Sequence, residues 1–398
     1  MDPDLVLARV ARDSYGRLIA QLVKRWGDLG LAEDALSEAM TLAVSRWPSG
    51  GVPNSPEGWL LAVAHRRCID QVRRKSRGRE LEREALQPWA QEGEELSSIP
   101  DERLELMMLC CHPALTQEIR VPLMLNAVWG ISARRLANGF ALKPSAMSAR
   151  LLRAKQKIKE TRLRFPKPSP DEFEERIGSL RQAFYLAFNI AAETDQPEFS
   201  LRTEISSLVE LLRKLQPAPD PETLGLLALF KFQSARDPSR RRSDGTMISF
   251  LEQDIELWDL SLIREAERLL TQAHRGGILG RFQLEAAIES AHIKGRYRGE
   301  TDWPAILTLY QGLLTTTPNL GPRVAFAGAL LEAGELLQAG EVLQSLQPES
   351  VAHYQPYWAT QAALLKTLGR QKESQEALAR AKALSQSPAQ KAFLEELS

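Results

Sequence analysis

A run of positive side chains near the middle of the chain offers the clearest chemistry in the sequence. Between Ser132 and Lys167 it contains eleven lysines and arginines and a single acid, Glu160. An exposed helix normally mixes both signs because opposite charges one turn apart stabilise it, so this run repels itself unless a polyanion neutralises it. We interpret it as a nucleic-acid contact, with a solvated surface helix as the competing interpretation. The cations are Arg134, Arg135, Lys143, Arg150, Arg153, Lys155, Lys157, Lys159, Arg162, Arg164 and Lys167.

Two helices are expected to position these cations. Ser132 can cap a short helix that Gly139 ends, and Pro144 can begin a second helix because its missing N–H costs nothing in a first turn. Two helices joined by a short, glycine-containing turn form a helix-turn-helix. Small side chains on the outer side of the second helix would let it enter a major groove, with cations beside them. The outer side as a whole carries Ser145, Ser148, Ala149, Leu152 and Arg153, flanked by Arg150, Lys155, Lys157 and Lys159, and its small side chains are at the leading end.

A second basic helix is predicted to begin at Ser55 and Pro56, which together form a start signal. Trp59, near its start, could stack on an unpaired base, although packing in the core is the competing interpretation. The cations on or beside the outer side of this helix could grip phosphates. They are Arg66, Arg67, Arg73, Arg74, Lys75, Arg77 and Arg79.

The helix predicted over residues 31–48 differs in charge from both basic helices. Asp34 and Glu38 lie one turn apart on its outer side. Next to two nucleic-acid-binding elements, an acidic helix face suggests a surface that docks on another protein.

Apolar residues at helical spacing predict one buried face in each of these segments and in residues 104–111. The predicted buried residues are Ala32, Ala35, Leu36, Ala39, Ala43 and Trp47; Leu61, Ala64, Cys68 and Val72; Leu104, Met107, Met108 and Cys111; and Met147, Leu151, Ala154 and Ile158.

Metal and catalytic chemistry have little support. The three cysteines are too few for a disulfide framework, and Cys110, Cys111 and His112 lack the two-residue gap that lets two thiolates face one ion. We therefore expect no metal, no cofactor and no catalytic residues. An enzyme on the C-terminal part is the remaining alternative, but its candidate residues have no catalytic spacing and no phosphate-binding glycine loop accompanies them. Those candidates are Glu252, Asp254, His274 and His292.

Charge divides the chain into two blocks. Residues 1–167 hold 27 lysines and arginines against 20 aspartates and glutamates, a net charge of +7, whereas residues 168–398 hold 24 against 31, a net charge of −7. This asymmetry indicates one part that meets a polyanion and one that does not. No apolar run approaches the ~20 residues that span a bilayer, and the N-terminus lacks the pattern of a secretory signal, so we expect a cytoplasmic protein.

Helical periodicity nearly everywhere predicts an all-α protein of two or three domains. Residues 84–101 are acidic and read as a linker, and alternate prolines in 166–170 predict a stiff spacer. The predicted domains are then 1–83, 102–165 and 171–398.

The last domain contains a weak repeat. Gly334 and Gly369 each lie between two predicted helices and are 35 residues apart, near the ~34-residue period of tetratricopeptide repeats. We expect stacked, tetratricopeptide-like helix pairs, with an irregular bundle as the alternative. The matched positions are Arg323 and Trp358, Ala327 and Ala362, Leu330 and Leu365, Ala339 and Ser374, and Leu343 and Leu378.

Several motifs together resemble the extracytoplasmic-function (ECF) sigma factors of the sigma-70 family. "AEDALSEAMTLAVSRWP" followed by "PEGWLLAVAHRRCIDQVRRKSR" resembles their region two, and "DERLELMMLCCHPAL" through "RLLRAKQKI" resembles region four. "CCHPAL" with "RLLRAK", and then "FYLAFN", "LEQDIELWD", "FQLEAAIESAH" and "TDWPAILTLY", resemble the subgroup with a long helical C-terminal extension. The resemblance implies an RNA polymerase sigma factor, which directs core polymerase to promoters and catalyses no reaction.

The resemblance also implies roles for single residues. Asp34 and Glu38 would dock on the clamp helices of the polymerase β′ subunit, and the β flap would be a second polymerase contact. Ser37, Met40, Lys143, Pro144 and Ala146 depart from the usual family residues. The helix that opens and reads the minus-ten promoter element would carry Trp59, Arg66, Arg67, Asp70, Arg73 and Arg74, and the minus-thirty-five element would meet Lys143, Ser145, Ser148, Arg150 and Arg153.

Two questions stay open at this point. A conventional helix-turn-helix transcriptional regulator with a protein-interaction domain would share the second basic element, but it would have no use for the acidic helix. The acidic extension could restrain the basic front half, or it could act as a scaffold on which a regulatory protein docks.

Overall fold

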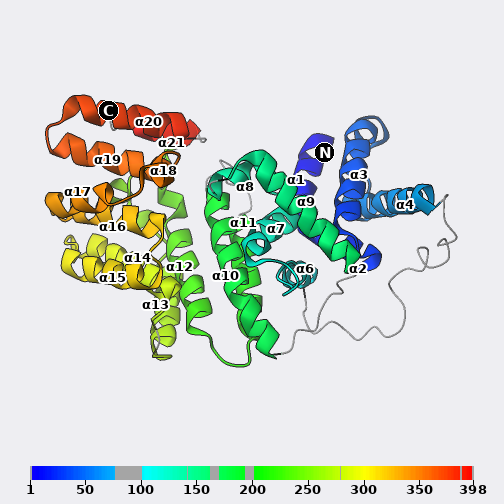
Figure 1. Ribbon diagram of the computed structural model, residues 1–398, viewed down its shortest axis with the longest axis horizontal. Coiled ribbons are helices and arrows are strands. Elements are labelled where there is room, and N and C mark those ends of the chain that lie inside the picture. Colours follow the sequence, from blue (N-terminus) through cyan, green and yellow to red (C-terminus); the bar gives the residue numbers. More distant parts are fainter. Residues whose placement is uncertain are drawn as a thin grey trace. The chain divides into compact units, whose positions relative to one another are not determined.

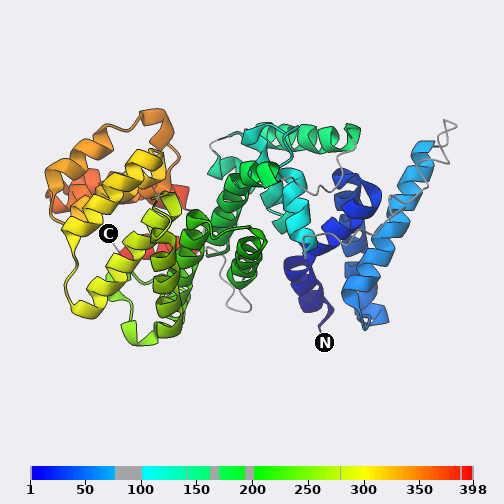
Figure 2. The ribbon, with the colours of Figure 1, turned by 90° about the horizontal axis from the view of Figure 1, so that it is seen from below.

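The structure, a computed structural model, describes residues 2–76, 101–140, 142–161, 170–192, 201–277, 279–385 and 388–396. Figures 1 and 2 show two views of it. The all-α prediction is confirmed: the described residues form helices joined by turns, and their β pairing is limited to an isolated bridge between Arg241 and Met247. The greater part of the acidic linker, residues 84–100, and residues 166–169 of the spacer lie outside the described residues, as do Arg77, Arg79, Arg162, Arg164 and Lys167.

The chain forms two compact units, Met1–Ala187 and Phe188–Ser398, which we call the front unit and the second unit. The division falls inside helix α10 (Pro170–Ala192) rather than at residue 171, where the extension was predicted to begin. The first five turns of α10 thus group with the front unit. When the charges are counted over these two units, the asymmetry is smaller than +7 and −7. Residues 1–187 hold 29 cationic and 24 acidic side chains, a net charge of +5, and residues 188–398 hold 22 and 27, a net charge of −5.

The first half of the front unit contains α1 (Pro3–Asp13), α2 (Tyr15–Trp26), α3 (Leu29–Gly50) and α4 (Pro56–Ser76). The Asp28 side chain caps α3 by accepting a hydrogen bond from the backbone N–H of Leu31 at 3.0 Å. Figures 1 and 2 both show α4 beside α3. All six residues predicted to form the inner face of α3 are buried.

The second half of the front unit contains α6 (Glu102–Cys110), α7 (Gln117–Trp129), α8 (Ala133–Gly139) and α9 (Pro144–Glu160). The predicted buried faces are confirmed in α9 and in residues 104–111. In α4 the prediction is confirmed for Ala64 and Cys68, which are fully buried, whereas Leu61 and Val72 are only partly buried and Leu60 is buried in place of Leu61. The face of α4 toward α3 follows Leu60, Ala64 and Cys68, which are spaced by four residues.

The second unit begins, after the end of α10, with α11 (Leu201–Leu215), α12 (Pro221–Ala235), α13 (Leu260–His274) and α14 (Arg281–Arg298). Helix α12 packs against both α13 and α14. Gly225 makes its approach to α14 feasible, because a Cβ atom there would lie 2.6 Å from the backbone nitrogen of Gln283.

Buried polar groups hold the turns that follow α12. The Arg236 guanidinium donates to Glu289 at 2.8 Å and to the amide oxygen of Gln253 at 3.3 Å. The Trp258 indole N–H donates to the Ser239 hydroxyl at 2.8 Å. These contacts connect the short 3-10 turns η1 (Asp237–Ser239), η2 (Phe250–Glu252) and η3 (Ile255–Leu257) to α14.

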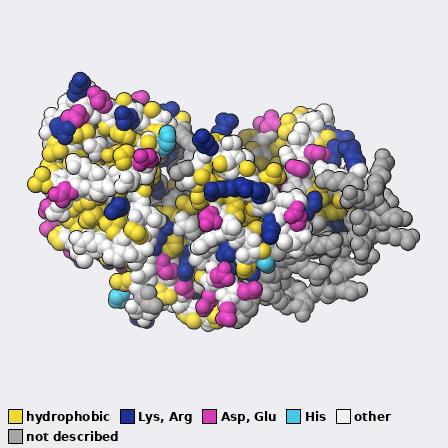
Figure 3. All heavy atoms as spheres, viewed as in Figure 1, with side chains coloured by type: hydrophobic (Ala, Val, Ile, Leu, Met, Phe, Trp, Pro, Cys, Tyr) yellow, Lys and Arg dark blue, Asp and Glu magenta, His cyan; other side chains and the backbone are white. Residues whose placement is uncertain are grey.

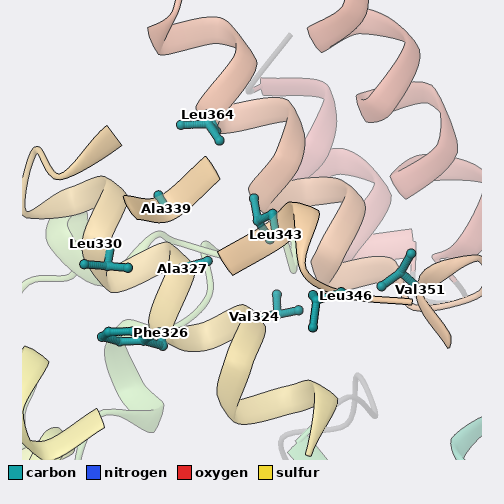
Figure 4. Close-up of a cluster of buried hydrophobic side chains, with 9 residues drawn as sticks. All are labelled: Val324, Phe326, Ala327, Leu330, Ala339, Leu343, Leu346, Val351 and Leu364. Carbon is teal, nitrogen blue, oxygen red and sulfur yellow. The ribbon is translucent and has the colours of Figure 1, made fainter. Parts of the chain in front are cut away.

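The rest of the second unit repeats one helix pair. Gly334 and Gly369 lie in the two turns with φ of +85° and +73°, a conformation that favours glycine. The matched pairs Ala327 and Ala362, Leu330 and Leu365, Ala339 and Ser374, and Leu343 and Leu378 are all buried. Figure 4 shows the core around the first pair. Membership in the tetratricopeptide class stays a prediction. The helices are α15 (Trp303–Thr316), α16 (Leu320–Glu332), α17 (Leu336–Gln344), α18 (Pro348–Val351), α19 (Gln355–Thr367), α20 (Gln371–Leu384) and α21 (Pro388–Glu396).

The close approach of α12 and α14 can be tested with one methyl group. Gly225→Ala should lower the free energy of unfolding by about 1–3 kcal/mol, because the new Cβ meets backbone that cannot move aside cheaply. Gly328→Ala, in α16, is the matched control: nothing lies within 4 Å of its Cβ position, so better helix propensity should stabilise the unit by up to about 1 kcal/mol. Chemical denaturation measures both, and equal effects would contradict the packing.

Candidate nucleic-acid and polymerase interface

Helix α9 presents the side chains predicted to meet the minus-thirty-five element. Pro144 occupies its first turn, and Ser132 caps the preceding α8 by accepting from the N–H of Arg135 at 3.4 Å. Lys143, Ser145, Ser148, Arg150 and Arg153 are all exposed. The Arg153 guanidinium bonds to the carbonyl of Ala149 in its own helix at 3.2 Å, so its charge has no carboxylate partner among the described residues. Figure 3 shows Lys and Arg side chains at the surface where Figure 1 places α9.

Helix α4 presents most of the residues predicted to meet the minus-ten element. Arg66, Asp70, Arg73 and Arg74 are exposed. Arg67 forms an ion pair with Glu38 of α3 at 3.3 Å, which links the predicted DNA-reading helix to the predicted polymerase-docking helix.

Trp59 packs inside the front unit. Its ring is half-buried and meets the buried Trp47 edge-on, with ring centroids 5.6 Å apart at 65°. This contact fits the core-packing interpretation of Trp59, which holds the start of α4 against α3, and stacking of Trp59 on a base stays a prediction.

The acidic face of α3 is open. Asp34 and Glu38 are exposed, as their spacing predicted, and Val44 further along the helix is 55% exposed. A helix with two carboxylates and an apolar side chain at its surface can dock on a protein through both charge and apolar contact.

Lys155 does not lie with the exposed cations of α9. Its ammonium donates to the Glu33 carboxylate of α3 and, at 2.7 Å, to the side-chain oxygen of Asn126 in α7. Only 16% of the Lys155 side chain and 18% of the Glu33 side chain is exposed. The assignment of Lys155 to DNA is therefore corrected for this arrangement, because its position directly after the buried Ala154 turns it toward α3.

The surroundings of Glu33 are poorly solvated. Burial raises the pKa of the Glu33 carboxyl by more than the adjacent Lys155 lowers it. The pKa of the neighbouring Tyr15 hydroxyl is also raised, mainly by burial and then by the charge of Glu33. The contact between Glu33 and Lys155 is thus a partly buried ion pair. The free energy needed to desolvate its two charges offsets much of the free energy gained from their attraction.

Two further ion pairs join the two halves of the front unit. Lys159 of α9 pairs with Asp28 at 2.7 Å, and Lys24 of α2 pairs with the buried Glu105 of α6 at 3.3 Å. We call the three pairs Lys155–Glu33, Lys159–Asp28 and Lys24–Glu105 the clasp. Beside it α2 approaches α7 so closely that a Cβ on Gly16 would lie 2.3 Å from the Val128 carbonyl oxygen.

Helix α10 completes the core of the second half of the front unit. Arg176 is 1% exposed, and its guanidinium lies 3.5 Å from the Met108 carbonyl and 3.7 Å from Glu172. Phe184 meets Trp129 edge-on with centroids 6.0 Å apart. The sequence analysis missed this role, although the apolar spacing of Ile177, Leu180 and Phe184 carried the signal.

The metal candidates Cys110, Cys111 and His112 form no metal site within the part of the chain that the structure describes. Within the described ranges, no group of three or more His, Cys, Asp or Glu side chains could hold a metal ion. Burial raises the pKa of Cys68 and of Cys111 to about 12, so both thiols are protonated at neutral pH. His292 is packed between the rings of Phe250 and Trp303. None of the helices that the structure describes has both the length and the apolar character to cross a membrane.

Two family models match separate parts of the chain. Residues 12–78 match sigma-70 region 2, and residues 176–274 match a family of unknown function (DUF6596). The chain is 32% identical over 402 residues to the uncharacterized protein R00370 of Rhizobium meliloti (strain 1021), an alignment that covers 98% of this chain and 94% of that protein.

A sigma factor is also among the similar proteins. The chain is 28% identical over 144 residues to the probable ECF RNA polymerase sigma factor SigI of Mycobacterium tuberculosis (strain CDC 1551 / Oshkosh), which covers 34% of this chain and 49% of that protein. SigI of strain ATCC 25618 / H37Rv gives the same values. No solved structure matches the chain.

An all-α unit with two exposed basic helices beside an acidic one, whose residues 12–78 match sigma-70 region 2, defines a sigma-type transcription protein. The chain belongs to the ECF group of the sigma-70 family of RNA polymerase sigma factors, in a form with a long C-terminal extension.

The clasp can be tested by breaking it from one side. Lys155→Met leaves Glu33 without its cation, and removing one partner of a fully buried pair costs roughly 3–5 kcal/mol. Because 16% and 18% of the two side chains is exposed, we expect a smaller loss here, about 2 kcal/mol in the free energy of unfolding of the front unit.

The double variant Lys155→Met with Glu33→Leu should recover most of that loss, because an apolar pair replaces the ion pair. Denaturant titrations of the wild type, both single variants and the double variant measure the coupling energy. Strictly additive losses would show that the two side chains do not interact.

Proposed function

We propose that this sigma factor recruits core polymerase through the acidic face of α3 and positions it on promoters through α4 and α9. The observation that carries the proposal is how the cations of the front unit divide. Those that lie between its two halves, Lys24, Lys155 and Lys159, have carboxylate partners. Arg66, Arg74 and Arg150, on the outer sides of α4 and α9, are exposed without an ion pair among the described residues. Unpaired cations on two helices suit a polyanion that runs past both.

Each of these surfaces then contacts a different part of the polymerase or of the promoter. Asp34 and Glu38 of α3 dock on the β′ clamp helices, and the second half of the front unit meets the β flap. Arg66, Arg73 and Arg74 hold the minus-ten element, where strand opening begins. Lys143, Ser145, Ser148, Arg150 and Arg153 face the minus-thirty-five element. Phosphate contacts supply affinity, and the few groove-facing side chains supply the choice of promoter. The protein acts in the cytoplasm, where polymerase and DNA meet.

Engaging both elements requires the clasp to open. Helices α4 and α9 both pack on α3, so their axes lie within about 20 Å of each other at ordinary helix spacing. The minus-ten and minus-thirty-five elements are centred about 25 base pairs apart, or roughly 85 Å of duplex. When the two halves separate, Lys155 and Lys159 lose Glu33 and Asp28 and become free to take DNA phosphates in their place. Their assignment to DNA then applies to the open state.

Arg153→Ala should weaken binding of the polymerase complex to a promoter and lower the slope of log affinity against log salt by about 1, because one phosphate contact is lost. In vitro transcription on genomic fragments with purified core polymerase first maps a promoter, and binding is then measured there at several salt concentrations. Arg9→Ala, an exposed cation of α1, is the control and should leave the slope unchanged. A wild-type slope in Arg153→Ala would remove Arg153 from the interface.

The alternative of a conventional helix-turn-helix regulator is weaker than it was from the sequence alone, because residues 12–78 match a region of polymerase sigma factors. Such a regulator would not need core polymerase for binding to its DNA site. Transcription that starts at mapped promoters only when this chain and core polymerase are both present supports the sigma role.

We also propose that the second unit regulates the front unit. Its five excess acidic side chains oppose an equal excess of cations in the front unit, so it can compete with DNA for the outer faces of α4 and α9. In the other version of this role, the second unit is a scaffold on which a regulatory protein docks.

Deletion of residues 193–398 separates the two versions, and it retains α10, which supports the core of the front unit. We expect transcription to rise, most at low salt, because screening weakens the competition. Circular dichroism and an unfolding curve show that the shortened chain is folded. Loss of transcription by a folded chain would instead make the second unit a required scaffold.

A further inference from the structure

The second unit contains a pocket of about 600 Å³ between its two repeated helix pairs. Roughly 300–1,000 Å³ is the range of small-molecule sites in proteins. Its floor consists of Leu343, Leu346 and Val351, which are buried and are labelled in Figure 4. Tyr357 and Trp358 of α19 and Arg380 of α20 also line it. Apolar floor, aromatic wall and a cation are thus contributed by α17, α18, α19 and α20.

The aromatic wall is held in place by contacts that leave the pocket open. The indole N–H of Trp358 donates to the Val351 carbonyl at 3.1 Å, which ties α19 to α18. Tyr357 meets Trp358 at 86° with ring centroids 5.1 Å apart. Trp358 occupies the position of Arg323 in the preceding pair, so the repeat does not require an aromatic residue there. A ligand would find this wall already formed, which lowers the entropy cost of binding.

Two polar groups of the pocket have neither a hydrogen bond nor an ion pair among the described residues. The Arg380 guanidinium lies over the Trp358 ring, 4.4 Å from its centroid, and it has no ion pair among the described residues. Arg370, which precedes the same helix, shows the contrast because it pairs with Glu373. Stacking on one ring face leaves the N–H edge of a guanidinium available. The Tyr357 hydroxyl has no hydrogen bond within the described part of the chain, and burial raises its pKa, so it remains a donor.

We propose that this pocket binds a small apolar carboxylate. The apolar, preferably aromatic, body of the ligand packs on Tyr357, Trp358 and the aliphatic floor, and its carboxylate pairs with Arg380. Gln344, His353 and the Tyr357 hydroxyl also line the pocket, but Arg380 is its arginine without an ion pair among the described residues. A single such cation beside an apolar floor favours a single anionic group, and the limited volume favours a small molecule over a folded partner. This inference goes beyond the proposed function, since binding needs neither polymerase nor DNA.

The test uses 1-naphthoate as the probe and the full-length chain in isothermal titration calorimetry. We expect one site per chain, with 1-naphthamide, which has the same ring system without the charge, binding at least about tenfold more weakly. Arg380→Gln should weaken 1-naphthoate binding about tenfold, by loss of a charge-assisted contact. Arg298→Gln, an exposed arginine at the end of α14, is the matched control and should bind as the wild type does.

A second variant tests the position of the site without touching its core. Ala352 is exposed and lines the pocket, so Ala352→Trp should fill the pocket and abolish binding while the unfolding temperature stays close to that of the wild type. Absence of 1-naphthoate binding to the wild type, equal affinity for the acid and the amide, or unchanged binding in Arg380→Gln would overturn the proposal. A short apolar peptide with a free C-terminus that binds more tightly than 1-naphthoate would overturn it too, in favour of a peptide site. None of these outcomes depends on transcription.

Discussion

The Lys155 ammonium, held between Glu33 and Asn126, is the contact on which the arrangement of the front unit depends. It joins α9, α3 and α7 at one point, where water has limited access. A cation in such a place is costly to desolvate, and it is stable only while its carboxylate and amide partners stay in position. The clasp therefore specifies one way of packing the two halves, more than it adds stability. In the function that we propose, DNA phosphates replace these carboxylates as partners of Lys155 and Lys159 when the clasp opens.

The carboxylates of α3 differ in how far they are exposed to solvent. Asp34 and Glu38 are on the solvent side of α3, whereas Glu33, one residue earlier, is turned toward α9. One helix thus supplies the proposed docking face for the polymerase and a carboxylate to the clasp. The Arg67–Glu38 pair adds a connection to α4. Because α3 contacts both basic helices, a protein that binds α3 would act on the element that holds the two proposed DNA-reading helices together.

The C-terminal extension begins inside the front unit and continues into the second unit. Helix α10 supplies Arg176 and Phe184 to the core of the front unit, and the chain then enters the second unit within the same helix. The pocket lies further along, between the repeated pairs, where Trp358 replaces a position that is not aromatic in the pair before it.

The sequence by itself determined the helices, most of their buried faces and the charge of their outer sides, because helical periodicity and capping are local properties. It predicted α8 and α9 from Ser132, Gly139 and Pro144, and it erred by one position in α4, where the direction of α3 selects Leu60 over Leu61. Only the tertiary structure decided which cations are free. Lys155 and Arg153 are two residues apart in one helix, yet the partner of Lys155 lies 122 residues away in α3. Such a pairing depends on how helices pack, and no pattern within a single helix contains it.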